Sequence, residues 1–328
     1  MRNGRQRGVA LVTALLVVAI ATVAAIAMAN RQQLDIRRTG SLLHGEQAWA
    51  YVVGAENWAV VVLRRDRQDS EIDTLGEDWS TQPPVSFVEG GSIIGRLIDL
   101  QGRFNVNNLV SGGGANVDSI DYYKRLLRLL DLEEELADAL VDWIDDDINV
   151  RFPDGAEDEN YLLLDTPYRV ANRPLADISE LRLVKGYTAE VVARLQPYLV
   201  ALPEPTPINV NTADALLLAA LDADLGLSDG EALVEARGED GYESVDSFKD
   251  QPAMNAKQVD DSLLSVETQW FLMVSQADIG QGRARLASLI QRTDAELRIV
   301  RRQRGRLRRG RNRRERFVYV QHRQVRGD

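Results

Sequence analysis

The stretch Val9–Ala29 reads VALVTALLVVAIATVAAIAMA, an uncharged run of 21 residues. At ~1.5 Å per residue, a helix of this length spans roughly the ~30 Å hydrocarbon core of a membrane. The leader before it carries Arg2, Arg5 and Arg7. Positive charge stays on the cytoplasmic side of a membrane. The sequence therefore predicts a single membrane helix with the rest of the chain on the outer side.

Three interpretations of this segment are open. It can be a plain membrane anchor, or a secretory signal cleaved after Ala27-Met28-Ala29, although the apolar run exceeds the ~7–15 residues usual in such signals. The third interpretation rests on Gly8, which ends a short basic leader directly before the apolar run. This arrangement resembles type IV pilins and pseudopilins. The resemblance implies that prepilin peptidase cleaves between Gly8 and Val9 and that Val9 is then methylated.

The helical pattern continues beyond the apolar run, with apolar residues at broadly helical spacing as far as Arg65. A continuous helix from Val9 to Arg65 would be ~85 Å long, which resembles the spine of a pilin. Most pilins carry a glutamate as the fifth residue of the mature chain, and here that position is Thr13. The resemblance implies that this glutamate neutralises the terminal amine of the neighbouring subunit during assembly. A subunit at the tip of the filament has no neighbour above it and therefore has no amine to neutralise.

The composition excludes several functions. The 328 residues include no cysteine and two histidines, so there is almost no material for a zinc site or a catalytic triad. The net charge of −11 is uneven, because residues 301–328 hold 12 arginines while the body between leader and tail carries about −24. Such a body repels nucleic acid and suits divalent cations or basic partners. We expect the tail to be a solvated extension, with contact to an acidic partner as a second interpretation.

Strand patterns stand on both sides of a long helical region. Residues 90–106 predict a hairpin that turns at Gln101-Gly102, and strand patterns return at residues 267–276 and 283–292, with weaker runs at 297–300 and 317–320. Between them, residues 122–143 predict one amphipathic helix. The sequence therefore predicts an α+β fold in which a long N-terminal helix packs on an antiparallel sheet that a large α-helical insertion interrupts.

Two segments of the insertion are similar to each other. Residues 178–195 and 211–237 each predict a helix, a glycine-containing turn and a second helix, which resembles a helix-hairpin-helix repeat. A competence-type, membrane-anchored DNA receptor is therefore an alternative function. DNA binding needs cationic residues at the hairpins, and acidic residues crowd the second segment. Packing of helical pairs is the favoured interpretation.

An acidic loop at residues 142–159 reads DWIDDDINVRFPDGAEDE and holds eight carboxylates against one arginine. Oxygen ligands at short, irregular spacing suit calcium better than magnesium, which prefers to keep its waters. The loop opens like an EF-hand, but Val150 stands where such a loop needs glycine and Ala156 where it needs a bidentate glutamate. The same carboxylates could serve a glycosidase-like enzyme, but no apolar pocket is evident that would raise one pKa.

Three strings resemble the K-type minor pseudopilins of type II secretion: IDLQGRFNVNNLV (98–110), GAEDENY (155–161) and PYRVANRPL (167–175). The resemblance implies a protein that is not an enzyme and that binds calcium in the insertion. The ligands that we expect are Asp147, Asp154, Glu157 and Asp158, with Asp145 and Asn149 as further candidates.

The resemblance also implies a place and a set of partners. The chain would sit in the inner membrane of a Gram-negative bacterium with its bulk in the periplasm. It would join the I- and J-type minor pseudopilins as the tip that initiates the pseudopilus for protein export. Further implied contacts are prepilin peptidase, the major pseudopilin and the inner-membrane assembly platform, without nucleic acid.

These expectations divide the chain into six parts. They are a leader (1–8), a transmembrane helix (9–29), the helix continuation with the first strands (30–115), the helical insertion (116–263), the C-terminal strands (264–300) and the basic tail (301–328).

Overall fold

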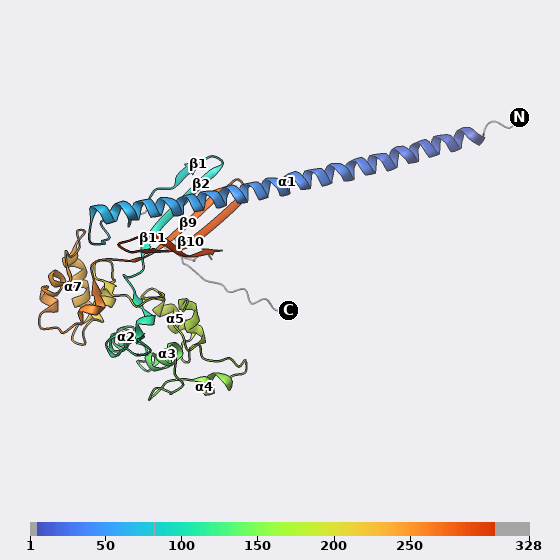
Figure 1. Ribbon diagram of the computed structural model, residues 1–328. Coiled ribbons are helices and arrows are strands. Elements are labelled where there is room, and N and C mark those ends of the chain that lie inside the picture. The colour runs from blue at the N-terminus through green and yellow to red at the C-terminus, as the bar shows by residue number, and fades with distance from the viewer. Residues whose placement is uncertain (1–4, 82, 306–328) are drawn as a thin grey trace.

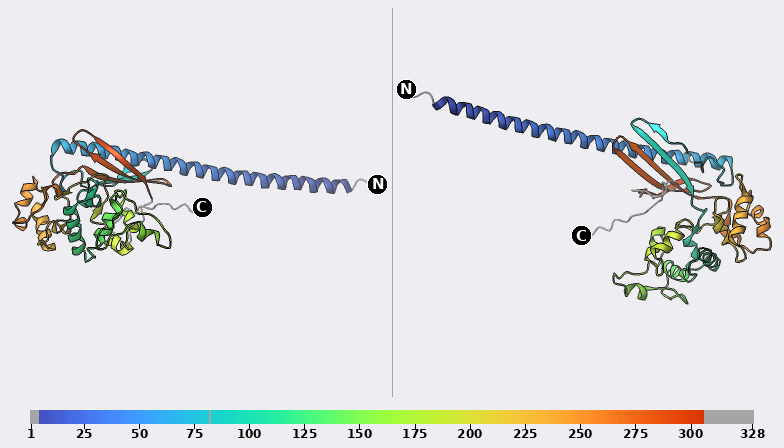
Figure 2. Two further views of the ribbon diagram at one scale, coloured as in Figure 1. Left: turned by 60° about the horizontal axis from the view of Figure 1, so that its bottom comes forward. Right: turned by 180° about the vertical axis from the view of Figure 1, so that it is seen from behind.

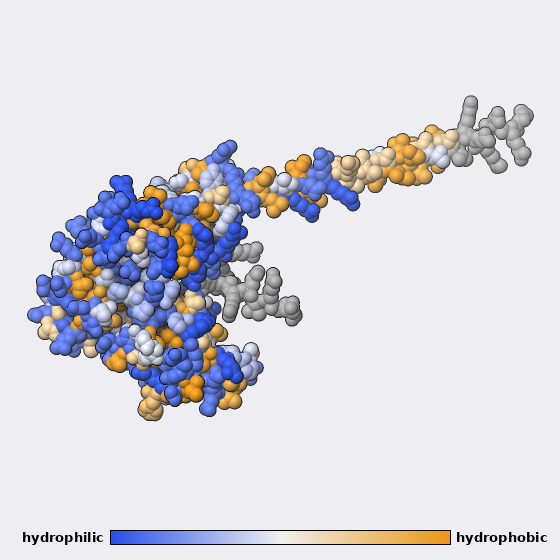
Figure 3. Space-filling view, viewed as in Figure 1, coloured by the Kyte–Doolittle hydropathy of each residue, from blue (hydrophilic) through white to orange (hydrophobic). Residues whose placement is uncertain are grey.

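A single helix runs away from the folded head (Figure 1). In the computed structural model, which describes residues 5–81 and 83–305, this helix is α1 (Arg5–Asp69), so it is ~98 Å long at 1.5 Å per residue. From Ala10 onward it is long and apolar enough to cross a membrane, and its apolar half is exposed. Figure 3 shows this apolar surface along the projecting part. The predicted spine is confirmed, and it extends a few residues beyond Arg65.

A five-stranded antiparallel sheet packs against the second half of α1 (Figure 2). The order of its strands is β1-β2-β9-β10-β11. The strands are β1 (Ser86–Val88), β2 (Gly91–Asp99), β9 (Trp270–Ile279), β10 (Gly282–Arg292) and β11 (Leu297–Arg304). Ala48, Val52, Ala59 and Leu63 lie on one helix face and are fully buried against the sheet. At Gly282, an added Cβ would overlap the His44 backbone, so this glycine permits the close approach of the β9–β10 turn to α1.

The structure corrects two details of the predicted sheet. The hairpin turns at Glu89-Gly90 between β1 and β2, not at Gln101-Gly102, because β2 pairs with β9 and the chain then leaves the sheet. β11 extends to Arg304, so the first four residues of the predicted basic tail belong to an edge strand. The expected strand at residues 317–320 lies outside the described residues.

The insertion fills residues 100–269, directly between β2 and β9, and therefore begins before residue 116 and ends after residue 263. It consists of two units, and a short parallel strand pair closes each of them. The first pair is β3 (Phe104–Asn105) with β6 (Leu199–Val200), and the second is β7 (Ile208–Asn209) with β8 (Leu264–Ser265). The antiparallel pair β4 (Val110–Ser111) and β5 (Gly114–Ala115) lies within the first unit.

Each unit opens with the same Asn-Val-Asn string. The Asn105 side-chain oxygen accepts the backbone N–H groups of Asn107 and Leu202, and the Asn209 oxygen accepts the N–H of Asn211. The Asn211 side chain bonds both the N–H and the C=O of Tyr242. These amides satisfy buried backbone groups where the short strands end, so the repeated string fixes the start of each unit.

Helical segments fill the rest of the insertion. The predicted helix at 122–143 is two helices, α2 (Val117–Leu129) and α3 (Leu136–Ile144), because Asp131 takes a left-handed conformation with φ of 52°. The helix pair predicted at 178–195 is η2 and α5, and the pair at 211–237 is α6 and α7. The remaining bounds are η1 (Val106–Leu109), α4 (Asp158–Leu162), η2 (Ile178–Leu183), α5 (Ala189–Leu195), α6 (Ala215–Ala219), α7 (Leu227–Arg237), α8 (Val245–Lys249), η3 (Pro252–Met254) and η4 (Asp261–Leu263).

Candidate metal centre

The acidic loop lies between α3 and α4, and a buried carboxylate organises it. Asp142 is fully buried and accepts the backbone N–H groups of Arg151 (3.1 Å) and Ala156 (2.8 Å). A Cβ at Gly155 would overlap this carboxylate and the Arg151 backbone. Arg151 in turn pairs with the buried Asp138 (3.0 Å). The loop is therefore folded back on the end of α3 by interactions that do not involve its other acids.

Three of the remaining carboxylates converge. Asp145, Asp147 and Glu157 each present an oxygen, and these oxygens all lie within 4.8 Å of one another. Asp145 stands at the C-terminal end of α3 and Glu157 directly precedes α4, so the two helix ends bring together residues that lie twelve apart in sequence. Both residues are buried, whereas Asp147 is exposed.

The buried oxygens of this group have no protein partner. Both carboxylate oxygens of Glu157, which is 4% exposed, and Oδ1 of Asp145 accept no hydrogen bond from the described residues. A buried carboxylate without a partner is costly. Burial, followed by the neighbouring acids, raises the pKa of Glu157 to about 7 and that of Asp145 to about 6. Oxygen ligands that are already gathered and desolvated fit a hard divalent cation such as calcium.

Asn172 is a further candidate ligand that the sequence did not single out. Its Nδ2 donates to the backbone carbonyl of Asp147 (2.9 Å), while its buried Oδ1 has no partner among the described residues. Its φ of 43° is left-handed, which asparagine tolerates better than most residues. The residue lies within the string PYRVANRPL, which is separate in sequence from the acidic loop. No spacing pattern of metal ligands therefore points to it.

The other predicted ligands lie outside this group of three. Asp158 accepts the N–H of Val170 (3.1 Å) and pairs with Arg169 (3.5 Å). Asp154 and Asn149 are exposed, and the backbone N–H of Asn149 donates to the Asp147 carboxylate (2.7 Å).

A second group of three carboxylates surrounds an arginine. Asp66, Asp73 and Glu77 also lie within 4.8 Å of one another. The buried guanidinium of Arg292 pairs with Asp66 (2.7 Å) and Asp73 (2.5 Å), and Glu77 accepts the indole N–H of Trp79 (2.9 Å). This group ties the end of α1 to the end of β10, and Arg292 supplies one positive charge to its three acids.

The residues singled out near the N-terminus lie on α1. Gly8 and Val9 fall within the continuous helix, and Thr13 is exposed, with its hydroxyl donating to the Ala10 carbonyl (3.0 Å). A hydroxyl bonded to its own helix cannot supply the negative charge that a glutamate would carry at this position.

Comparison with known proteins gives one consistent result. Two family models described as "Type II secretion system (T2SS), protein K" match residues 102–204 and 208–267, which correspond closely to the two units of the insertion. The chain is 41% identical to type II secretion system protein K of Pseudomonas aeruginosa over 93% of this chain and 94% of that protein. It is 35% identical to protein K of Aeromonas hydrophila over 92% of this chain and 98% of the relative.

A solved structure is similar to most of this chain. It is the GspK-GspI-GspJ complex of the type 2 secretion system from enterotoxigenic Escherichia coli, in which the matching chain is 30% identical, with a TM-score of 0.72. The match covers 82% of this chain and 99% of that one.

We expect Glu157→Gln to weaken calcium binding at least about tenfold, because the amide removes one anionic ligand from a site with few others. Titration calorimetry on the full-length protein in detergent measures the change. The control is Asp154→Asn, which removes an exposed carboxylate from the same loop and leaves the affinity within about twofold. Equal losses in both variants would mean that the loop binds cations only diffusely.

We expect calcium affinity to fall as the pH is lowered from about 8 to about 6. The raised pKa values mean that Glu157 and Asp145 hold protons in this range without metal, and the ion must displace them. Without calcium, the same two groups lower the stability of the fold as the pH rises from about 4 to about 7, because the folded chain binds more protons than the unfolded chain. A calcium affinity that stays constant between about pH 8 and about pH 6 would contradict the assigned ligands.

Proposed function

Because the chain belongs to the protein K family of the type II secretion system, we propose that it caps the tip of the pseudopilus together with I- and J-type minor pseudopilins. The chain is a minor pseudopilin, with a long apolar N-terminal helix on an antiparallel sheet. The observation that carries the proposal is the likeness to a chain solved in a GspK-GspI-GspJ complex. In this proposal the tip complex initiates the filament whose growth exports proteins across the outer membrane.

In this proposal the single helix α1 both anchors the protein in the membrane and contacts the other subunits. Its first half has an exposed apolar surface of the length that a bilayer requires, and its second half carries the head. In this proposal the N-terminus with its basic leader lies in the cytoplasm and the head lies in the periplasm of a Gram-negative cell, since positive charge favours the cytoplasmic side of a membrane. After extraction from the inner membrane by the assembly platform, the same apolar surface can pack against the helices of other pseudopilins, including the major one.

Two features favour the tip rather than an internal position. The insertion adds two units at one end of the head (Figure 1), where they leave little space for a subunit above. Thr13 offers no carboxylate to the terminal amine of a neighbour. A subunit with both features can begin a filament, but no further subunit can be added above it.

Calcium is the proposed cofactor of the insertion, held by Asp145, Asp147 and Glu157 with Asn172 beside them. The ion would supply the charge that the loop lacks and would join the end of α3 to the start of α4. Its role would be to order the acidic loop. The proposed function rests on assembly rather than on catalysis, since the family is a structural component of the secretion apparatus. The comparisons do not favour the DNA-receptor alternative.

We expect the mature chain to begin at N-methylated Val9, because a short basic leader that ends in Gly8 directly precedes the membrane helix. Intact-mass spectrometry of protein extracted from inner membranes identifies the first residue. A chain that begins at Asn30 would contradict both anchoring and assembly, and an uncleaved Met1 would contradict processing by prepilin peptidase.

We expect Leu43→Glu to reduce recovery of the I- and J-type subunits at least about tenfold when the three full-length proteins are co-expressed and purified in detergent. Leu43 is 64% exposed on α1, where a charge would have to be buried between helices. The matched control is Leu163→Glu, which changes a leucine that is 88% exposed on the insertion. Loss of the complex in both variants, or in neither, would contradict assembly through α1.

A further inference from the structure

Residues 146–165 run from the end of α3 through α4 and expose apolar side chains among acids; we name this surface the acidic face. Six of the 13 large apolar residues that are exposed beyond α1 in the described chain lie on it: Ile148, Val150, Phe152, Leu162, Leu163 and Leu164. Phe152 is 90% exposed and Leu163 is 88% exposed. Figure 3 shows apolar and hydrophilic atoms side by side at the lower end of the head, where Figure 1 places α4. Exposed apolar residues that gather in one region are typical of interaction surfaces.

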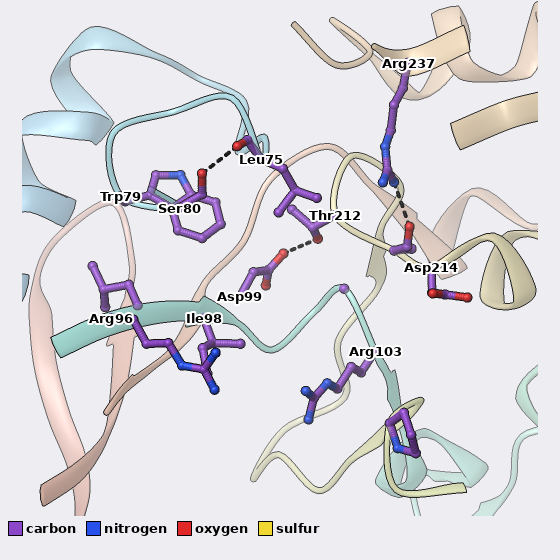
Figure 4. Close-up of a pocket in the computed structure, with 14 residues that line it drawn as sticks. Leu75, Trp79, Ser80, Arg96, Ile98, Asp99, Arg103, Thr212, Asp214 and Arg237 are labelled. Carbon is purple, nitrogen blue, oxygen red and sulfur yellow. Dashed lines mark hydrogen bonds between the residues drawn. The ribbon is translucent and has the colours of Figure 1, made fainter. Parts of the chain in front are cut away.

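The acids of this surface are largely free of partners. Four of them are exposed, and their side chains have no hydrogen-bond or ion-pair partner within residues 5–81 and 83–305: Asp146, Asp154, Glu159 and Asp165. The junction of sheet and insertion is different, because beside its cavity of about 440 Å³ the Thr212 hydroxyl donates to Asp99 (Figure 4). None of the four exposed acids belongs to the group of three carboxylates proposed to hold calcium. Their negative charge therefore stays available to a cationic partner when calcium is bound.

The C-terminal tail of the same chain has the complementary composition. Residues 306–328, which lie outside the described residues, contain nine arginines against Glu315 and Asp328. Among these arginines stands the apolar run FVYV at residues 317–320. Arginine forms bidentate hydrogen bonds with carboxylates, and aromatic and branched side chains bury apolar surface. The tail thus offers both kinds of side chain that the acidic face would bind.

The end of β11 places the acidic face within reach of the tail. Arg301 of β11 donates from Nη1 to the backbone carbonyl of Ala176 (2.6 Å), and Asn172, in the same segment, donates to that of Asp147 (2.9 Å). Along these contacts Gly305 lies within roughly 50 Å of Asp147, since an extended residue spans ~3.3–3.6 Å. The chain from Gly305 to residue 320 can extend about as far, and all 23 residues of the tail can extend ~75 Å. A tethered segment within reach has an effective concentration of the order of mM, so even a weak contact is populated.

We propose that the basic tail, residues 306–328, binds the acidic face of its own chain. Its arginines would pair with the exposed acids, and residues 317–320 would pack on the exposed apolar side chains around Phe152 and Leu163. The contact goes beyond the tip function, because it requires neither α1 nor another subunit. A bound tail covers a surface that another protein could otherwise occupy, so the tail acts as an internal competitor for that surface.

Photo-cross-linking of the full-length protein tests this contact. The chain contains no cysteine, so Gln321→Cys supplies a single thiol directly after the apolar run, and benzophenone maleimide is attached to it. The labelled protein is placed in nanodiscs of phosphatidylcholine and phosphatidylglycerol at one fixed calcium concentration. The anionic lipid offers the basic tail a competing surface. We expect peptide mapping by mass spectrometry to locate most of the cross-links within residues 146–165 of the same molecule.

In the labelled protein, the double change Phe152→Ser and Leu163→Ser removes apolar contact from the acidic face. We expect the cross-link yield there to fall at least about threefold, because burial of such side chains stabilises a contact. Both residues are exposed, so the thermal midpoint of the fold should stay unchanged. The matched control is Phe87→Ser, which changes a phenylalanine that is 88% exposed on β1 and leaves the yield unchanged.

Four outcomes would overturn the proposal. They are cross-links mainly to lipid, cross-links mainly to the second unit of the insertion, cross-links mainly between two copies of the chain, and a yield in the acidic face that the double change does not lower. An equal loss of yield in the control Phe87→Ser would overturn it as well, because the loss would then not be specific to the acidic face.

Discussion

The fold depends on a pairing between two strands that are distant in sequence. Asp99 at the end of β2 lies opposite Phe271 in β9, and the N–H of Leu100 donates to the Trp270 carbonyl (3.0 Å). The whole insertion must therefore leave and re-enter the sheet at neighbouring positions. The entropy of closing so long a loop grows only slowly with its length, by about 0.6 kcal/mol per doubling. The insertion meets the requirement by folding around its own apolar core, with Phe104, Tyr122 and Tyr123 stacked at its centre.

Buried polar groups locate the joints of this arrangement. The junction of sheet and insertion is held by Asp99 and Asn209, and the end of α1 is held by Arg292 between two aspartates. In both places the buried charge or amide has partners within the fold. The acidic loop differs, because the buried oxygens of Glu157 and Oδ1 of Asp145 have no partner among the described residues. In the acidic loop the unsatisfied groups thus point to a ligand, whereas the satisfied groups at the other two joints hold the architecture.

Much of the fold could be predicted from the sequence, because apolar periodicity directly reports α1, the later strands and the paired helices. The turn of the first hairpin could not, since Gln101-Gly102 carries a turn signal but stands where the chain leaves the sheet. The break between α2 and α3 could not be predicted from the sequence either, because both helices place apolar residues on the same core and their apolar pattern continues across the break. For the metal site, composition indicated the acidic loop, and Asp145, Asp147 and Glu157 were among the candidates. Asn172 could not be found, because only the tertiary fold brings it beside Asp147.

The two borders of the sheet restrict how this head can meet its neighbours. At one border, β1 has only three residues, and at the other, β11 carries Arg298, Arg301, Arg302 and Arg304. Short and strongly charged border strands resist pairing with strands of another molecule. Among the described residues, neither border strand favours a continuous intermolecular sheet. Contacts of α1 would therefore determine how this subunit packs against its lateral neighbours in a filament. Side-chain packing along α1 would then exclude subunits that do not fit. Backbone hydrogen bonds between strands would not discriminate in this way, because every chain can form them.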